Sequence, residues 1–191
     1  MLKMNYWGEQ WGLHPDVCPC DVHFNEWVEG AALRNKLIYH FGTGTHHVIG
    51  RRQAELGAGN VVFAITASKE EYDEYVSLVI ENAPLAKSYL TYFGDIYLTN
   101  ARLLPDFDVV NLFHLCEFAS PNTTSAEYGG LSDRRLLDLF TAKTRRAGHI
   151  LFYSGSKDFD KAQPVIAAWE KEQPVERLDD FKSLLVYRKT A

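Results

Sequence analysis

Apolar runs of strand length alternate with helix-length segments along most of the chain. The runs that predict strands are residues 36–41, 60–66, 95–99, 107–114 and 149–153. Between them, apolar residues recur at the spacing of amphipathic helices, as at Tyr72, Tyr75, Val76, Val79 and Ile80. This alternation is typical of βαβ units, in which helices join parallel strands. We therefore expect a mainly parallel sheet with helices on both faces.

Local signals predict where the helices begin and end. Ser68 and Glu71 form a capping box, in which each side chain satisfies a free backbone N–H of the first turn. Pro84 is expected to interrupt or restart the helix that follows, which runs on toward Tyr92. A second helix is predicted over residues 45–56. A third begins near Asp133 and carries Lys143, Arg145 and Arg146 in its last turn before Gly148.

The end of the chain predicts an antiparallel hairpin. Residues 120–130 form a polar loop, and residues 162–169 have the spacing of one more amphipathic helix. The short runs 175–178 and 183–188 are then joined by a turn at Asp179-Asp180. Runs this close in sequence can pair only as antiparallel strands. Five strand–helix units are thus followed by a two-stranded hairpin.

This plan, with Gly42 and Gly44 after the first strand and Gly94-Asp95 near the third, resembles the class I (Rossmann-like) S-adenosylmethionine-dependent methyltransferases over residues 30–190. The resemblance implies a doubly wound, mainly parallel seven-stranded sheet with helices on both faces and a C-terminal antiparallel hairpin. We expect a single domain, residues 1–191. Residues 1–30 would be a lid or anchoring segment and residues 31–191 the core.

The glycines after the first strand are the first candidate site. Ligands of open α/β sheets bind beyond the carboxyl ends of the strands, and glycine lets the backbone turn tightly beside them. By resemblance, Gly42 and Gly44 hold the methionine part of the cofactor, and His40 stands where the family has an acid. The alternative is an ordinary strand-to-helix turn. A dinucleotide fingerprint does not fit, because position 47 is histidine and the second strand ends in Thr66.

The next two strand ends supply the other cofactor candidates. The family usually ends its second strand with an acid that binds the ribose hydroxyls, whereas this chain has Thr66. Thr66 is therefore expected beside the ribose. By resemblance, Asp95 accepts a hydrogen bond from the adenine amino group, and Ile96 packs on the ring. A role for Asp95 in a tight turn is equally open.

His114 and Glu117, after the fourth strand, are the catalytic candidates. Imidazole titrates near neutral pH, so His114 is expected to act as general base and Glu117 to orient it. The alternative is a histidine that satisfies a backbone partner. The Asn-Pro-Pro-Tyr or Asp-Pro-Pro-Tyr tetrapeptide typical of methylation of nucleic-acid amines is absent here.

The first 30 residues are rich in aromatic and metal-ligating side chains. In many small-molecule methyltransferases such a segment lies over the cofactor, and these aromatic residues either close the pocket or anchor the segment. Cysteine and histidine are zinc ligands, but the C-x-C spacing is tighter than usual and no second ligand pair follows. We therefore expect packed thiols and no metal site. The residues in question are Tyr6, Trp7, Trp11, His14, Cys18, Cys20, His23, Phe24 and Trp27.

Composition limits the classes of partner and the location that we expect for the protein. The chain has 191 residues, 46% hydrophobic and 24% charged, which is ordinary for a globular protein. Its net charge of −5 argues against nucleic acid as a partner. Three cysteines suit a reducing compartment. We find no secretory signal and no apolar stretch near the ~20 residues that span a bilayer, so we expect a cytoplasmic protein without membrane contact.

These observations predict methyl transfer from S-adenosylmethionine to a small-molecule or peptide-like acceptor, mainly by positioning the acceptor. An alternative is a catalytically inactive binding or scaffolding protein with a degenerate cofactor site, because His40 and Thr66 replace two of the family's acids. A nucleotide-binding module that uses the same glycine turn is a third reading. The oligomeric state stays open.

Overall fold

A seven-stranded sheet forms the centre of the protein in a computed structural model, which describes residues 3–118 and 125–191. The strand order is β3-β2-β1-β4-β5-β7-β6. Strands β1 to β5 pair in parallel, and β7 pairs antiparallel with β5 and β6, which confirms the predicted sheet and hairpin. The strands are β1 (Leu37–Phe41), β2 (Val61–Thr66), β3 (Tyr89–Phe93), β4 (Phe107–Asn111), β5 (Thr144–Tyr153), β6 (Val175–Arg177) and β7 (Leu184–Lys189).

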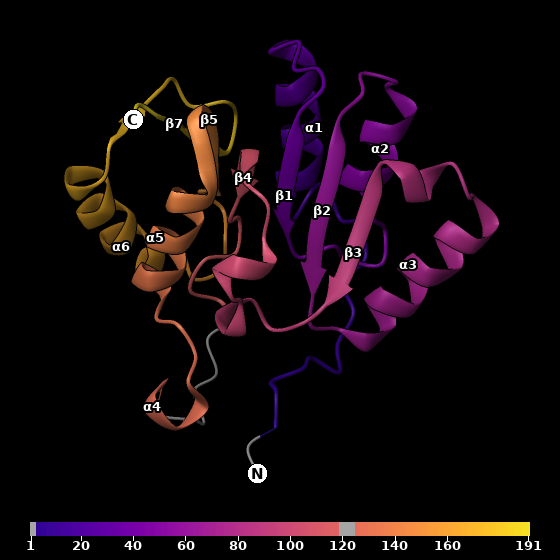
Figure 1. The fold of residues 1–191 in the computed structure, drawn as a ribbon, viewed down its shortest axis with the longest axis horizontal. Helices are drawn as coiled ribbons and strands as arrows, with labels where there is room; N and C mark the ends of the chain where they lie inside the picture. The colour runs from indigo at the N-terminus through magenta and orange to yellow at the C-terminus, as the bar shows by residue number, and fades with distance from the viewer. Residues whose placement is uncertain (1–2, 119–124) are drawn as a thin grey trace.

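Helices cover both faces of this sheet (Figure 1). Helices α1, α2 and α3 pack on one face, and α5 and α6 pack on the other. None of the described helices is both long enough and apolar enough to cross a bilayer. The helices are α1 (Cys20–Gly30), α2 (Val48–Glu55), α3 (Lys69–Glu81), α4 (Ser125–Tyr128), α5 (Asp133–Lys143) and α6 (Phe159–Glu172), with short 3-10 turns η1 (Leu85–Lys87), η2 (Ile96–Leu98) and η3 (Ala101–Leu103).

Successive residues of the central strands face the two cores in turn. On β1, Ile38 packs with Phe24 of α1 and Ile49 of α2. Its neighbour Tyr39 packs on the other side, with its ring centroid 4.3 Å from that of Phe140 of α5. Because both faces are buried, the central strands are mainly apolar rather than alternating, and this property allowed their prediction from the sequence.

The third strand lies earlier in the chain than predicted. Residues 89–93 form β3 beside β2, and the predicted strand at 95–99 is wrong, because 96–98 form a 3-10 turn. The helix predicted to run toward Tyr92 ends at Glu81. Proline lacks the N–H that a continuing helix needs, so only the turn η1 follows Pro84.

Two further boundaries, one helix and the burial of one residue differ from the prediction. Arg145, Arg146 and Gly148 belong to β5 rather than to the end of α5. A Cβ at Gly148 would lie 2.8 Å from the carbonyl oxygens of Arg145 and Asp108, so this glycine permits close strand packing instead of ending a helix. Helix α2 begins at Val48, because the left-handed His47 (φ 46°) delays it. Helix α1 was not predicted, and Ile80, expected on a buried face, is 75% exposed. Of the predicted polar loop, residues 120–124 lie outside the described residues.

The close approach of α2 to the sheet depends on Gly50, and this gives a stability prediction. A Cβ at Gly50 would lie 2.5 Å from ring atoms of the buried Tyr89. We expect Gly50→Ala to lower the free energy of unfolding by about 1–3 kcal/mol, since the ring must shift within a packed core. Gly30→Ala is the matched control, because a Cβ on that helical glycine meets nothing within 4 Å. Urea unfolding measures both, and equal stabilities for the two variants would contradict the packing argument.

Candidate functional site

A cavity of about 350 Å³ opens at the carboxyl ends of β1, β2 and β4. Strand order reverses beside β1, which has β2 on one side and β4 on the other, so the cavity lies at the switch point of the sheet. Its volume falls in the ~300–1,000 Å³ range of small-molecule sites. Five of the six predicted cofactor residues line it, namely Gly42, Gly44, Thr66, Asp95 and Ile96, as do both catalytic candidates, His114 and Glu117.

The glycine loop after β1 has positive φ angles, which residues other than glycine adopt less readily. Gly42 and Gly44 have φ of 82° and 55°. A Cβ at Gly44 would overlap the His46 ring and lie 2.8 Å from the carbonyl oxygen of Trp11. A Cβ at Gly42 would meet nothing within 4 Å, so a ligand can approach the backbone closely there, whereas His46 and Trp11 fill the space beside Gly44.

His40, the sixth predicted cofactor residue, is not among the described residues that line the cavity. Its imidazole is buried, and its Nδ1–H donates to Oδ1 of Asn111 at 2.8 Å. Burial lowers the pKa of His40 to about 3, although the bond to Asn111 opposes the shift, so the ring is neutral. Its Nε2 lies 3.8 Å from Asp21 Oδ2, and that carboxyl does line the cavity.

Asp21 brings an acid to this end of the site from α1. Its carboxyl is also 3.9 Å from His46 Nδ1. Burial raises the pKa of Asp21 to about 7, against the opposing charge of His114. Sequence reasoning missed Asp21, because it lies in a segment treated as an aromatic cover and approaches β1 only through the packing of α1.

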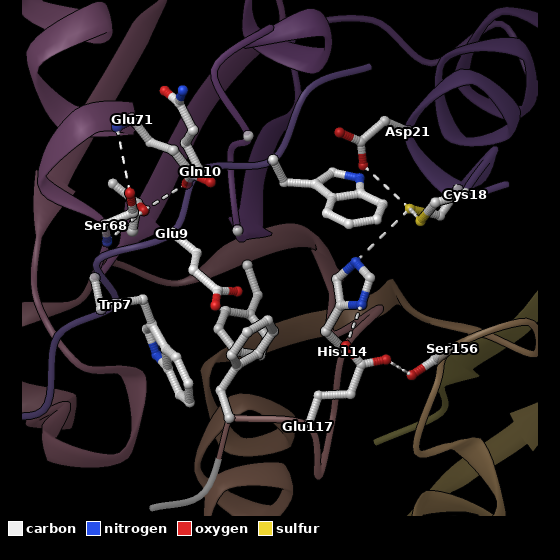
Figure 2. A pocket seen from close by; sticks show the side chains of 18 of the residues that line it. Trp7, Glu9, Gln10, Cys18, Asp21, Ser68, Glu71, His114, Glu117 and Ser156 are labelled. Atoms are coloured by element: carbon white, nitrogen blue, oxygen red, sulfur yellow. Dashed lines mark hydrogen bonds and ion pairs between the residues drawn. The ribbon is translucent and has the colours of Figure 1, made fainter. Parts of the chain in front are cut away.

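Glu71 brings a second acid to the end of β2. Thr66 Oγ1 and Thr43 Oγ1 both donate to its Oε2, at 2.7 and 3.1 Å. The predicted capping box is only half formed, since the Ser68 hydroxyl accepts from Glu71 N at 3.5 Å while Ser68 N donates to Thr66 Oγ1 instead. The freed carboxylate lines the cavity beside Thr66 (Figure 2).

Asp95 has the role in a tight turn that the sequence left open as one of two. Its Oδ1 accepts from Tyr97 N at 2.9 Å, which caps the turn η2, and its Oδ2 accepts from the Tyr128 hydroxyl at 2.7 Å. Asp95 and the adjacent Ile96 also line the cavity. A carboxylate has about four lone-pair sites, so capping leaves acceptor capacity for a ligand.

His114 and Glu117 are in contact, as their spacing predicted. Nδ1 of His114 lies 3.0 Å from Glu117 Oε2. The other oxygen of Glu117 accepts from Lys157 N at 2.7 Å and from the Ser156 hydroxyl. Burial alone would raise the pKa of Glu117, but the bonds from His114, Ser156 and Lys157 hold it at about 2. Glu117 is therefore an ionised, fixed carboxylate that orients the imidazole.

Two thiols of the N-terminal segment face the other side of the His114 ring. Cys18 Sγ is 3.5 Å from Cys20 Sγ, which is 4.0 Å from His114 Nε2 (Figure 2). The hydrogen bond with Cys20 lowers the pKa of Cys18 to about 5, and the same contact with burial raises that of Cys20 well above its usual range. Burial opposes protonation of His114, but bonds to Cys18 and Glu117 raise its pKa to about 10. Spacing could not reveal this cluster, because His114 lies 94 residues from Cys20.

The N-terminal segment crosses the mouth of the cavity. Trp7 N donates to the Ala67 carbonyl, and the Trp11 carbonyl accepts from Thr45 N, both at 2.9 Å. Trp7, Glu9 and Gln10 lie beside Ser68 and Glu71 in Figure 2. The backbone of this segment is thus tied to β2 and to the glycine loop.

Beneath the glycine loop, His47 supports Glu71 and gives a pH prediction. Its Nε2–H donates to the Glu71 carbonyl at 2.8 Å, and its Nδ1 accepts from the Tyr89 hydroxyl at 2.7 Å. Burial lowers the pKa of His47 from 6.5 to about 4, although the bond to Glu71 opposes the shift. The unfolded chain therefore binds the proton more tightly, and stability present above pH 6.5 is lost as the pH falls toward 4.

We expect His47 to remove about 2 kcal/mol of unfolding free energy between about pH 7 and about pH 5. His40 and His46, whose pKa values burial lowers to about 3 and about 4, act in the same direction. Urea unfolding of wild type and His47→Gln at both pH values isolates the contribution. The variant should lose less stability on acidification, and an unchanged loss would show that His47 is not buried as a neutral ring.

Comparison with known proteins identifies the fold. No protein-family model matches the chain, and no curated protein matches its sequence. The CcbJ methyltransferase from Streptomyces caelestis has a TM-score of 0.63 at 13% identity, with 96% of this chain and 98% of that chain covered. Precorrin-6y C5,15-methyltransferase from Geobacter metallireducens has a TM-score of 0.60 at 11% identity, with 98% of this chain and 94% of that chain covered. An O-methyltransferase family protein from Burkholderia thailandensis has a TM-score of 0.61 at 12% identity, with 91% of this chain and 56% of that chain covered. The chain thus has the fold of the class I methyltransferases.

Proposed function

We propose that the protein is an S-adenosylmethionine-dependent methyltransferase with a small-molecule or peptide-like acceptor. The observation that carries this proposal is the carboxylate of Glu71 at the end of β2, hydrogen bonded to Thr66. Threonine replaces the acid expected there, and a neighbouring helix supplies one. Asp21 does the same beside His40. Two replacements that each restore an acid favour a working cofactor site over a degenerate one.

The residues around the glycine loop fit the parts of the cofactor in order along the strand ends. Gly42 and Gly44 would receive the methionine part, with open space beside the backbone of Gly42 and with His46 and Trp11 packed against Gly44. Thr66 and Glu71 would bind the ribose hydroxyls, and Asp95 the adenine, with Ile96 against the ring. When bound, S-adenosylmethionine supplies an electrophilic methyl group. The chain's contribution is to hold both reactants in line and to exclude water.

The acceptor would lie on the β4 and β5 side, next to His114 and Glu117. At neutral pH His114 carries a proton, because its pKa is about 10. Its Nε2–H can orient an acceptor or offset negative charge on it, and base catalysis by His114 requires that this proton leave first.

The N-terminal segment limits the acceptor. Because residues 7–14 line the cavity and their backbone is bonded to Ala67 and Thr45, access favours small or flexible molecules over a folded macromolecule. The net charge of −5 also disfavours nucleic acid. All three cysteines are free thiols, which supports a cytoplasmic location.

Calorimetric titration tests the proposal. We expect S-adenosylmethionine and S-adenosylhomocysteine to bind with Kd values of about 1–100 μM. ATP is the control for a general nucleotide-binding module and should bind at least about tenfold more weakly. Absence of heat with millimolar ligand, for protein shown to be folded by circular dichroism, would overturn the methyltransferase proposal. Tighter binding of ATP would favour the nucleotide-binding alternative.

A further inference from the structure

We propose that Cys18, Cys20 and His114 bind a zinc ion whose remaining coordination position faces the cavity and takes an acceptor thiol. The metal site stands on the geometry of these three residues alone, and only the role of the thiol rests on the proposed function.

The three ligand atoms have the spacing of a tetrahedral zinc site. All lie within 4.8 Å of one another, with 3.5 Å between the two sulfurs and 4.0 Å between Cys20 Sγ and His114 Nε2. Bond lengths of about 2.3 Å to sulfur and 2.0 Å to nitrogen give about 3.8 Å between two sulfurs and about 3.5 Å between sulfur and nitrogen. The two measured separations are thus within about half an ångström of these values, and the third, between Cys18 Sγ and His114 Nε2, is no more than 4.8 Å.

The surroundings of His114 are those of a zinc-bound histidine. Such a histidine usually donates its other ring N–H to a carboxylate, which fixes the tautomer and aims the free nitrogen at the metal. Glu117 occupies this position, 3.0 Å from Nδ1, and is itself held by Lys157 N. Figure 2 shows His114 between Glu117 on one side and the cysteine sulfurs on the other.

Charge balance also favours a divalent cation. Cys20 is only 3% exposed, and two thiols this close cannot both ionise at low cost without a counter-charge. Two thiolates, a neutral imidazole and Zn²⁺ sum to zero. The chain thus places a soft ligand set, which zinc prefers, where a metal removes the like-charge repulsion between the sulfurs.

The ligand set leaves one tetrahedral position for an external ligand. Sites with three protein ligands and an open position are typical of catalytic zinc, whereas structural sites are closed by four. Asp21 lines the same cavity but is not in the group of described ligand atoms that lie within 4.8 Å of one another. All three ligands line the cavity, so the open coordination position would face a molecule bound in the cavity.

A thiol is the acceptor that suits this position. Its pKa of about 8.5 is far below that of an alcohol, and zinc deprotonates a coordinated thiol outright. Binding would exchange zinc-bound water for the thiolate and release the thiol proton to solvent. Methylation would then form a sulfur–carbon bond and break the donor's sulfonium–methyl bond, which leaves a thioether and S-adenosylhomocysteine.

Metal analysis of the full chain, purified without chelators, tests the site. We expect about one zinc per chain in the wild type. A chelator should remove this zinc, and added zinc should restore the site. Cys18→Ser and His114→Ala should each lose at least about tenfold in zinc affinity. Cys116→Ser is the matched control and should retain the metal, since Cys116 lies outside the cluster. Asp21→Asn should also retain zinc. Loss of zinc in this variant would mean that Asp21 is the fourth ligand, which would contradict the open coordination position.

Two further measurements separate this proposal from the proposed function. In the cobalt-substituted protein, ethanethiol should shift the visible absorption bands and add thiolate-to-cobalt charge transfer. S-adenosylhomocysteine should bind whether zinc is present or chelated. Failure of the wild type to bind added zinc, with rapid alkylation of Cys18 or a Cys18–Cys20 disulfide, would overturn the metal site alone. Zinc binding without S-adenosylhomocysteine binding would overturn the methyltransferase proposal alone.

Discussion

Gly44→Val is expected to abolish measurable binding of S-adenosylhomocysteine, with a loss of at least about 100-fold in affinity. Gly44 has a φ of 55°, where a β-branched residue is strained. Its Cβ would also overlap the His46 ring and lie 2.8 Å from the Trp11 carbonyl. Both neighbours line the cavity, so either relaxation changes the wall that meets the methionine part of the cofactor.

Gly57→Val is the matched control for this variant. Gly57 has a nearly identical φ of 59°, but it follows α2 away from the cavity, and a Cβ there meets nothing within 4 Å. Both variants should lose about 1–2 kcal/mol of stability from backbone strain. Only Gly44→Val should lose binding, as measured by calorimetry. Affinity within about threefold of wild type in Gly44→Val would mean that the loop does not contact the ligand.

The fold could be predicted from the sequence where both faces of a strand are buried. Residues 61–65 and 109–110 are apolar because both faces of the sheet are covered, and this signal does not depend on tertiary detail. The errors fell where a local signal competed with packing. The run 89–93 has the aromatic and β-branched residues of a strand, but the amphipathic spacing before it made continuation of the helix plausible.

Of the site, only the residues that follow the ends of strands could be predicted from the sequence. Gly42, Gly44, Asp95, His114 and Glu117 follow strand ends directly, so the topology alone brings them to one edge. Asp21 and the two thiols enter the cavity from α1 and the turn before it, and no spacing rule links those positions to β4 or β1. Such contacts arise from the packing of α1, which the sequence treats as a separate segment.

Glu71 was visible in the sequence but was assigned to the wrong partner. In a complete capping box its carboxylate would accept from Ser68 N. That N–H instead bonds to Thr66 Oγ1 at 3.1 Å, and Thr66 in turn donates to Glu71. Threonine at the end of β2 therefore does not merely replace an acid, because its hydroxyl holds the carboxylate of α3 at the end of β2, where the proposed function requires an acid.

Glu71→Gln is accordingly expected to weaken S-adenosylhomocysteine binding by about 10–100-fold, since a charge-assisted bond to a ribose hydroxyl is worth about 1.5–3 kcal/mol. Glutamine keeps an oxygen that accepts from Thr66 and Thr43, so the fold should be retained, as thermal unfolding would check. The neighbouring Glu70→Gln is the matched control, because Glu70 is exposed and is absent from the cavity lining of the described residues.

A second ligand makes this test specific to the ribose. If Glu71 binds the diol, the wild type should prefer S-adenosylhomocysteine over its 2′-deoxy analogue by about tenfold, and Glu71→Gln should discriminate by less than about threefold. Such coupling between one side chain and one hydroxyl cannot arise from a general loosening of the cavity, which would weaken both ligands equally. Equal discrimination by wild type and variant would mean that the carboxylate serves only Thr66 and Thr43. The replacement of the acid at the end of β2 would then mark a degenerate site, and the binding or scaffolding alternative would account better for the cavity.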